Sequence, residues 1–124
     1  MIEDLPTLSP VRVEGAAGTR PLGIRVYAAW RLGARLRGLL FRPPLGEDEG
    51  LLLCPCAQIH TLGLGYPLDL AYLDKRGVVV KCVSGLAPNR ISGAWRGRQV
   101  LELAAGGLAR TGLQQGERLC WDRP

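Results

Sequence analysis

The residues best suited to chemistry are a histidine and two carboxylates in apolar surroundings. His60 is the one histidine of the chain, and histidine titrates near neutral pH. Asp69 stands at the head of an apolar run, and Glu102 interrupts another. A free carboxylate is costly to bury, so each must be bonded within the fold or open onto a pocket. His60 and Asp69 could form the acid–base pair of a hydrolase. The alternative is that all three are structural, and Glu102 could equally face solvent.

Two cysteines near the histidine raise the question of a metal site. Cys54, Cys56 and His60 give the pattern Cys-x-Cys-x3-His, which differs from the usual spacings of zinc ligands. Buried, inert thiols are therefore the preferred interpretation, with a metal-binding domain as an alternative. Cys82 and Cys120 lie in apolar strands and are expected in the core. The chain begins without an export signal, which predicts reduced thiols and a cytoplasmic location.

An aromatic residue among arginines suggests a binding surface. Trp95 lies in the polar stretch 84–98, between Arg90 on one side and Arg96 and Arg98 on the other. An exposed tryptophan in this setting would suit a partner or a ligand; a loop anchor tucked into the core is the alternative. The formal charge is +5, but no nucleic-acid-binding motif accompanies it, so we do not expect a nucleic-acid partner. No nucleotide-binding motif is present and no cofactor is expected.

Glycine and proline punctuate the chain and predict short strands joined by tight turns. The 17 glycines and 9 prolines separate runs that alternate or are uniformly apolar, as strands do. The expected strands are 11–14, 22–28, 51–54, 57–61, 68–74, 78–83, 100–103 and 117–121. Two hairpins are predicted, one that joins 11–14 to 22–28 through the turn 15–18, and one that joins 68–74 to 78–83.

Helical patterns are brief. The spacing of Leu32, Leu36, Leu39 and Leu40 predicts a helix that ends at Pro43, and 106–112 permits a short helical turn. The sum is a mainly β fold, a compact sandwich or partly closed barrel with one or two short helices. A chain of 124 residues suits one domain, 1–124, with 1–9 as a loose lead. No run approaches the roughly 18 apolar residues of a membrane span.

Five segments, in order along the chain, resemble one family. The matching stretches are GLLFR at 38–42, GLLL at 50–53, PLD at 67–69, LELAAG at 101–106 and GE at 116–117. The family is domain of unknown function 192, a prokaryotic group, and the resemblance covers about 22–121. It implies a compact β-sandwich-like domain with a short helix and no settled activity. Ile59-His60-Thr61 stands where most members carry Trp-Met-Lys-Asn-Thr, which is typical of a variant branch.

These observations favour a domain that binds a small ligand or a protein partner in a polar cleft. Arg42 belongs to the family signature and follows the apolar helix, so we expect it to turn inward and pair with Asp69. The stretch 84–98 would serve as a lid. The candidate ligand-binding residues are Arg42, His60, Thr61, Asp69, Trp95 and Glu102.

Overall fold

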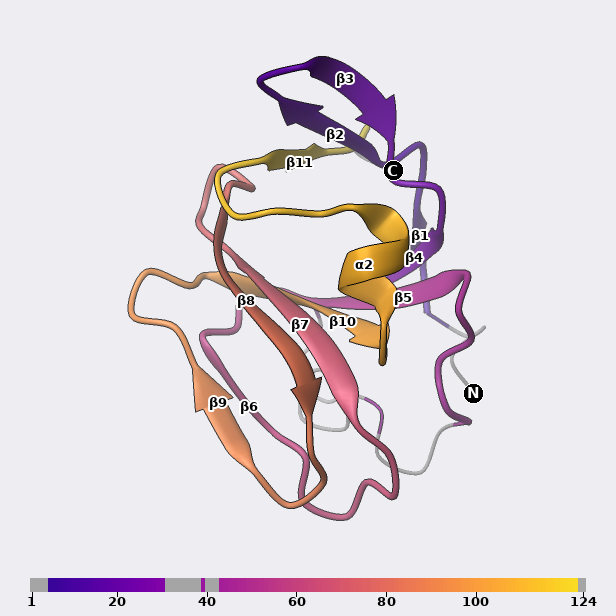
Figure 1. Cartoon of the computed structure of the whole chain (residues 1–124), viewed down its shortest axis with the longest axis vertical. Coiled ribbons are helices and arrows are strands. Elements are labelled where there is room, and N and C mark those ends of the chain that lie inside the picture. The colour runs from indigo at the N-terminus through magenta and orange to yellow at the C-terminus, as the bar shows by residue number, and fades with distance from the viewer. Residues whose placement is uncertain (1–4, 31–38, 40–42, 123–124) are drawn as a thin grey trace.

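The computed structural model describes residues 5–30, 39 and 43–122. It is built on one six-stranded sheet, shown in Figure 1. Across this sheet the strands are β1 (Thr7–Leu8), β4 (Arg25–Ala29), β5 (Glu49–Leu53), β10 (Gln99–Ala104), β7 (Leu68–Leu73) and β8 (Val79–Leu86). All neighbours are antiparallel except β4 and β5, which run parallel. The remaining strands cover the two faces of this sheet. The prediction of a mainly β fold is confirmed.

The central strands are covered on both faces, which explains their uniformly apolar sequence. All six residues of β7 are buried, and so are five of the six in β10. Because successive side chains of a strand point to opposite faces, each strand supplies both halves of the core. Leu101 and Ala71, which are paired, belong to one apolar cluster, whereas the next pair, Val100 and Tyr72, belongs to the other.

A small sheet and a short helix cover the first face. The sheet has the order β11 (Arg118–Cys120), β2 (Arg12–Gly15) and β3 (Gly18–Pro21), and the helix is α2 (Gly107–Thr111). Val13 and Leu119 are buried in the first cluster, and Leu108 of α2 packs against it. The turn 106–112 is therefore confirmed as a helical one. With only five residues, α2 is far too short to cross a bilayer, and no helix in the described ranges is long and apolar enough to do so.

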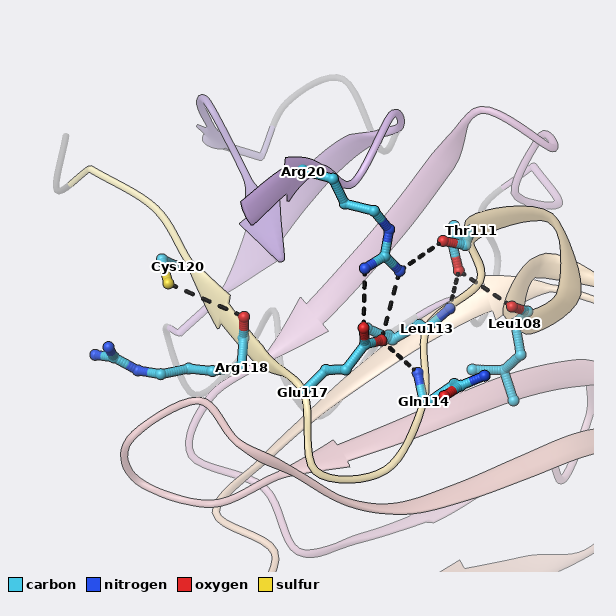
Figure 2. Close-up of polar contacts among 8 residues, drawn as sticks. All are labelled: Arg20, Leu108, Thr111, Leu113, Gln114, Glu117, Arg118 and Cys120. Atoms are coloured by element: carbon cyan, nitrogen blue, oxygen red, sulfur yellow. Dashed lines mark hydrogen bonds and ion pairs between the residues drawn. The ribbon is translucent and has the colours of Figure 1, made fainter. Parts of the chain in front are cut away.

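Arg20 ties this layer together. Its guanidinium donates to Glu117 Oε2 at 2.9 Å and to the Thr111 carbonyl at 3.0 Å, as Figure 2 shows. Glu117 Oε1 in turn accepts the Gln114 N–H at 2.8 Å. Strand β3 is thereby joined to the end of α2 and to the turn before β11. The hydrogen bond from Arg20 holds the pKa of Glu117 below its usual value.

A two-stranded ribbon covers part of the second face. It consists of β6 (Gln58–His60) and β9 (Ile91–Gly93) and lies at the lower left of Figure 1. Ile59 is buried in the second cluster, and the Tyr72 hydroxyl contacts Ser92 Oγ at 3.0 Å. We call this pair of strands the ribbon. Its second strand lies within 84–98, so the prediction of one continuous loop there is wrong: β8 runs on to Leu86 before β9 begins.

The prediction that 11–14 forms a hairpin with 22–28 is also wrong. Strand β2 pairs with β3 through the closing pair Gly15 and Gly18. Only two residues separate these glycines, so the returning strand starts at Gly18 and ends before 22–28. Strand β4 then leaves for the large sheet, where it pairs with β1 and β5. The second predicted hairpin, β7 with β8, is confirmed. Apart from Leu39, the helix predicted over 32–40 lies outside the described residues.

We expect Arg20→Ala to lower the free energy of unfolding by about 1 kcal/mol at pH 7, because it removes charge-assisted hydrogen bonds from a half-buried carboxylate. The pKa of Glu117 is lowered in the folded chain, so this contribution is present above the unfolded pKa and is lost as the pH falls through the folded one. Urea denaturation of both proteins between pH 3 and pH 7 measures it. Arg110→Ala is the control: its pair with Glu47 spans 3.8 Å and is exposed, so it should contribute below about 0.5 kcal/mol.

Candidate functional site

Asp69 is a structural carboxylate that joins three elements. Its side chain is 1% exposed. Oδ1 accepts the N–H of Gly85 at 2.8 Å, and Oδ2 accepts the N–H of Leu108 at 2.9 Å. Gly85 lies where the register of β7 and β8 shifts, and Leu108 is in the first turn of α2, whose N-cap residue is a glycine without a side chain to bond it. Asp69 therefore secures a β-bulge and supplies the missing helix cap from another strand.

The expected partner of Asp69 was an arginine, and the observed partners are backbone amides. Arg42 lies outside the described residues, so its predicted pairing with Asp69 stays a prediction. Each oxygen of Asp69 already accepts one N–H, so the carboxylate has hydrogen-bond partners without it.

Glu102 is the second buried acid, and its surroundings differ. It is 4% exposed and lies between Leu51 of β5 and Leu70 of β7 in the sheet register. Among the described residues, its Oε1 atom has no hydrogen-bond partner, and neither does the buried hydroxyl of Tyr66. Burial raises the pKa of the Glu102 carboxyl to about 8. Burial, with a smaller effect of Glu102, also raises the pKa of Tyr66. Near neutral pH, Glu102 is therefore a mostly protonated carboxylic acid.

Sequence reasoning missed Tyr66. It lies just before the Pro67-Leu68-Asp69 segment, and a tyrosine in a turn gives no sign of where its hydroxyl will be buried. A raised carboxyl pKa is a property that active sites often share. A general acid must also reach a substrate, and Glu102 is almost fully enclosed.

Thr61 also has a structural role. It is fully buried, and its hydroxyl donates to the Ala87 carbonyl at 2.7 Å and accepts the Arg90 N–H at 2.9 Å. These bonds fasten the turn between β8 and β9 to the end of β6. His60, next to it, is exposed, and its Nδ1 accepts the N–H of Leu62 at 3.2 Å. The two residues are adjacent in sequence, but only the imidazole is available at the surface.

The predicted cleft is therefore divided. Asp69 is enclosed on the first face of the large sheet, bonded to β8 and α2, whereas His60 lies on the surface of the ribbon, which covers the second face. Their hydrogen bonds go to separate groups, so the acid–base pair expected of a hydrolase is not formed between them. In the described part of the chain, no three His, Cys, Asp or Glu side chains are grouped to hold a metal ion, and Cys54, Cys56 and His60 accordingly form no such set.

Trp95 lies on the surface of the molecule. Its side chain is 97% exposed, so the alternative of a loop anchor tucked into the core is wrong. Trp95 and Arg96 occupy the corner of a tight turn closed by the Gly97 N–H and the Ala94 carbonyl at 3.0 Å. We call Ala94–Gly97 the Trp95 turn.

The backbone of the Trp95 turn is held on both sides. The Ala94 N–H donates to the Ala57 carbonyl at 3.0 Å, and the N–H of Arg98, just after the turn, donates to the Leu73 carbonyl at 2.8 Å. A Cβ atom on Gly97 would approach Tyr72 Cδ1 to 3.2 Å, so this glycine lets the turn sit closely on the core. The indole is thus presented by a fixed backbone.

A groove runs beside the indole. Its volume is about 610 Å³, and Trp95 forms part of its lining. The other lining residues are Cys56, Ala57, Gln58, Gly93 and Ala94. Most of these side chains are small, and the Cys56 thiol donates to the Gln58 carbonyl at 3.0 Å. We call this the Trp95 groove. Its composition suits an apolar side chain better than a charged one.

Comparison with known protein families identifies the family of this chain. The family model of domain of unknown function 192, described as an uncharacterised ACR, matches residues 13–121. The chain belongs to this family. No curated protein matches the chain.

Two solved structures share the fold of this DUF192 chain. One is a protein from Sinorhizobium meliloti 1021 named as a proposed transcription regulator, with 26% identity, a TM-score of 0.77 and coverage of 90% of this chain and 91% of that one. The other is a protein of unknown function from Novosphingobium aromaticivorans DSM 12444, with 26% identity, a TM-score of 0.76 and coverage of 92% of this chain and 85% of that one.

We expect Asp69→Asn to destabilise the DUF192 domain by about 3 kcal/mol, because an amide cannot accept from two N–H groups that face different oxygens. Asp74→Asn is the matched control. Asp74 also accepts two backbone N–H groups, from Arg76 and Val78, but both bond to the same oxygen, which an asparagine retains. Urea denaturation of the three proteins at pH 7 measures the difference. Equal losses for the two variants would contradict the role assigned to Asp69.

Glu102→Gln should remove a pH dependence of stability. A carboxyl whose pKa is raised to about 8 by folding favours the folded state most below its unfolded pKa. That stability is lost progressively as the pH rises toward the folded pKa, by up to about 1.4 kcal/mol per pH unit. Relative to the natural protein, the variant should therefore gain stability between pH 5 and pH 8. Thermal melts across this range measure the gain, and the exposed Glu47→Gln should show none. A constant difference across the range would exclude the raised pKa.

Proposed function

We propose that this domain is a binding module for a protein partner and that its binding surface is formed by the Trp95 turn, the Trp95 groove and the adjoining ribbon. One observation carries the proposal: a tryptophan is 97% exposed to water at the corner of a turn that is bonded to Ala57, just before β6, and that is followed by a bond from Arg98 to β7. A large aromatic side chain contributes most to binding when a partner buries it. A fixed backbone lowers the entropy lost on binding.

The geometry beside the indole supports the same function. The Trp95 groove could receive one apolar side chain of the partner while the indole packs against its neighbours. Ile91 of the ribbon is 74% exposed and adds a second apolar side chain. His60, exposed at the end of β6, is the one polar candidate from the sequence that we place at the margin of this surface.

In this proposal the other candidate residues do not contact the partner. Thr61 positions the turn that leads into β9, and Asp69 positions β8 before it. Glu102 is buried on the second face of the large sheet. Arg42 remains a ligand-binding candidate on its family signature alone. The hydrolase alternative loses its support, because His60 and Asp69 bond to separate groups. We further propose that 1–124 forms one domain and that the protein is cytoplasmic, as predicted from the sequence.

Trp95→Ala should leave stability nearly unchanged and abolish binding. Peptides would be selected by phage display on the immobilised full-length protein, and their affinities for both forms measured by fluorescence polarisation. We expect selected peptides to lose about tenfold or more in affinity for Trp95→Ala. The melting temperature should stay within about 2 °C, because the indole buries almost no surface. Trp30→Ala, at the next most exposed tryptophan, is the control and should bind normally. Failure to select any peptide, or equal binding by Trp95→Ala, would exclude the proposal.

A further inference from the structure

We propose that the partner is an acidic protein segment, in which Asp or Glu side chains flank an apolar residue that enters the Trp95 groove. This inference rests on the proposed function and names the chemistry of the partner. It follows from the distribution of charge around Trp95, and from the way in which charges are compensated elsewhere in the described residues.

The surface around Trp95 is built from a stretch of chain without acids. Between Asp74 and Glu102 the sequence has six basic residues and no carboxylate. Of the two bordering acids, Glu102 is buried, and Asp74 bonds the backbone of its own turn and interacts with Arg76 in that turn. The basic side chains nearest the ribbon and the Trp95 turn are all exposed: Lys81, Arg90, Arg96 and Arg98.

Four arginines elsewhere in the described residues form ion pairs. Arg12, Arg20, Arg110 and Arg118 each lie within 4 Å of a carboxylate, at distances from 2.9 to 3.8 Å. Around Trp95, the hydrogen bonds of the basic side chains go to backbone carbonyls instead. Arg98 donates to Gly97, Arg90 donates to Asn89, and Lys81 donates to Gly93 at 2.6 Å. The Lys81 ammonium also lies 5.9 Å from the centre of the Tyr72 ring. Within the described residues, no carboxylate forms an ion pair with the basic side chains of this surface.

The positions of these charges fit a segment that spans the groove. Arg96 shares the corner of the turn with Trp95, and Arg98 is the first residue after the turn. Lys81 reaches across from β8 to the carbonyl of Gly93, which lines the groove. The residues next to an apolar side chain in the groove would thus carry the cations of Lys81, Arg96 and Arg98. Carboxylates of the partner, on either side of that apolar side chain, would pair with these cations. Complementary charge of this kind speeds association and selects the partner.

A protein segment fits better than a nucleic acid. Single-stranded nucleic acids are held by successive aromatic side chains on which bases stack. In the described part of the surface, Trp95 is the one aromatic residue with nearly full exposure, and Trp30 follows at 39%. A groove of about 610 Å³ beside a single exposed indole offers an apolar surface for a protein segment but no row of aromatic rings for successive bases.

The test uses the full chain and a fluorescein-labelled peptide, Glu-Asp-Glu-Phe-Leu-Glu-Asp-Glu. Its comparison peptide has Gln and Asn in place of the acids, and an oligothymidylate of about eight nucleotides represents nucleic acid. We expect the acidic peptide to bind about tenfold more tightly than the amide peptide and to weaken as salt is added. Arg96→Glu/Arg98→Glu should lower its affinity by about tenfold or more. Arg12→Glu/Arg110→Glu makes the same change in net charge outside this surface and should bind as the natural protein does.

Four results would overturn the inference. Equal binding of the acidic and amide peptides, both lost in Trp95→Ala, would leave the proposed function intact and exclude an acidic partner. Tighter binding of the oligothymidylate than of the acidic peptide would identify a nucleic acid as the partner. A dimer in solution that Trp95→Ala dissociates would identify a second copy of this chain as the occupant. If neither these peptides nor the displayed ones bind, the proposed function fails together with the inference.

Discussion

The placement of one buried carboxylate determines the course of much of the chain. Asp69 bonds the bulge of β8 with one oxygen and the first turn of α2 with the other. A buried acid is tolerated only when such bonds replace its lost hydration. The bulge redirects β8, and the turn that follows is fastened by Thr61 before β9 begins. The Trp95 turn comes directly after β9, so its position depends on this series of polar contacts that begins in the core.

The two faces of the large sheet differ in how they are closed. On the first face, Arg20 and Glu117 join β3 to the segment between α2 and β11, and opposite charges are paired. On the second face, the ribbon leaves an indole and several cations without such partners in the described residues. A surface that is internally compensated contributes to stability, whereas an uncompensated one can contribute to binding. The proposed binding function rests on this contrast between the two faces.

Two acids in similar apolar strands have different environments for a geometric reason. Asp69 lies near the start of β7, next to a bulge and a helix start, where unpaired N–H groups are available. Glu102 lies in the middle of β10, where the neighbouring backbone groups are already used by the ladder with β5 and β7. Its carboxyl therefore stays protonated at neutral pH. Alternation of apolar and charged residues alone does not distinguish these two positions.

Local patterns in the sequence were sufficient for the strands β4, β5, β7, β8 and β10 of the large sheet, for the β7–β8 hairpin and for the helical turn near Gly107, because each depends on neighbouring residues. They did not show β3 or β9, which fall in stretches expected as a turn and a loop. They were also sufficient to identify Asp69 and Trp95 as unusual. Tertiary structure decided what each residue does. The partners of Asp69 come from Gly85 and Leu108, which are distant in sequence. The exposure of Trp95 depends on the backbone bonds from Ala94 to Ala57 and from Arg98, just after the turn, to Leu73. Residues that the chain brings together only on folding leave no local periodicity, so sequence could name these side chains but not their surroundings.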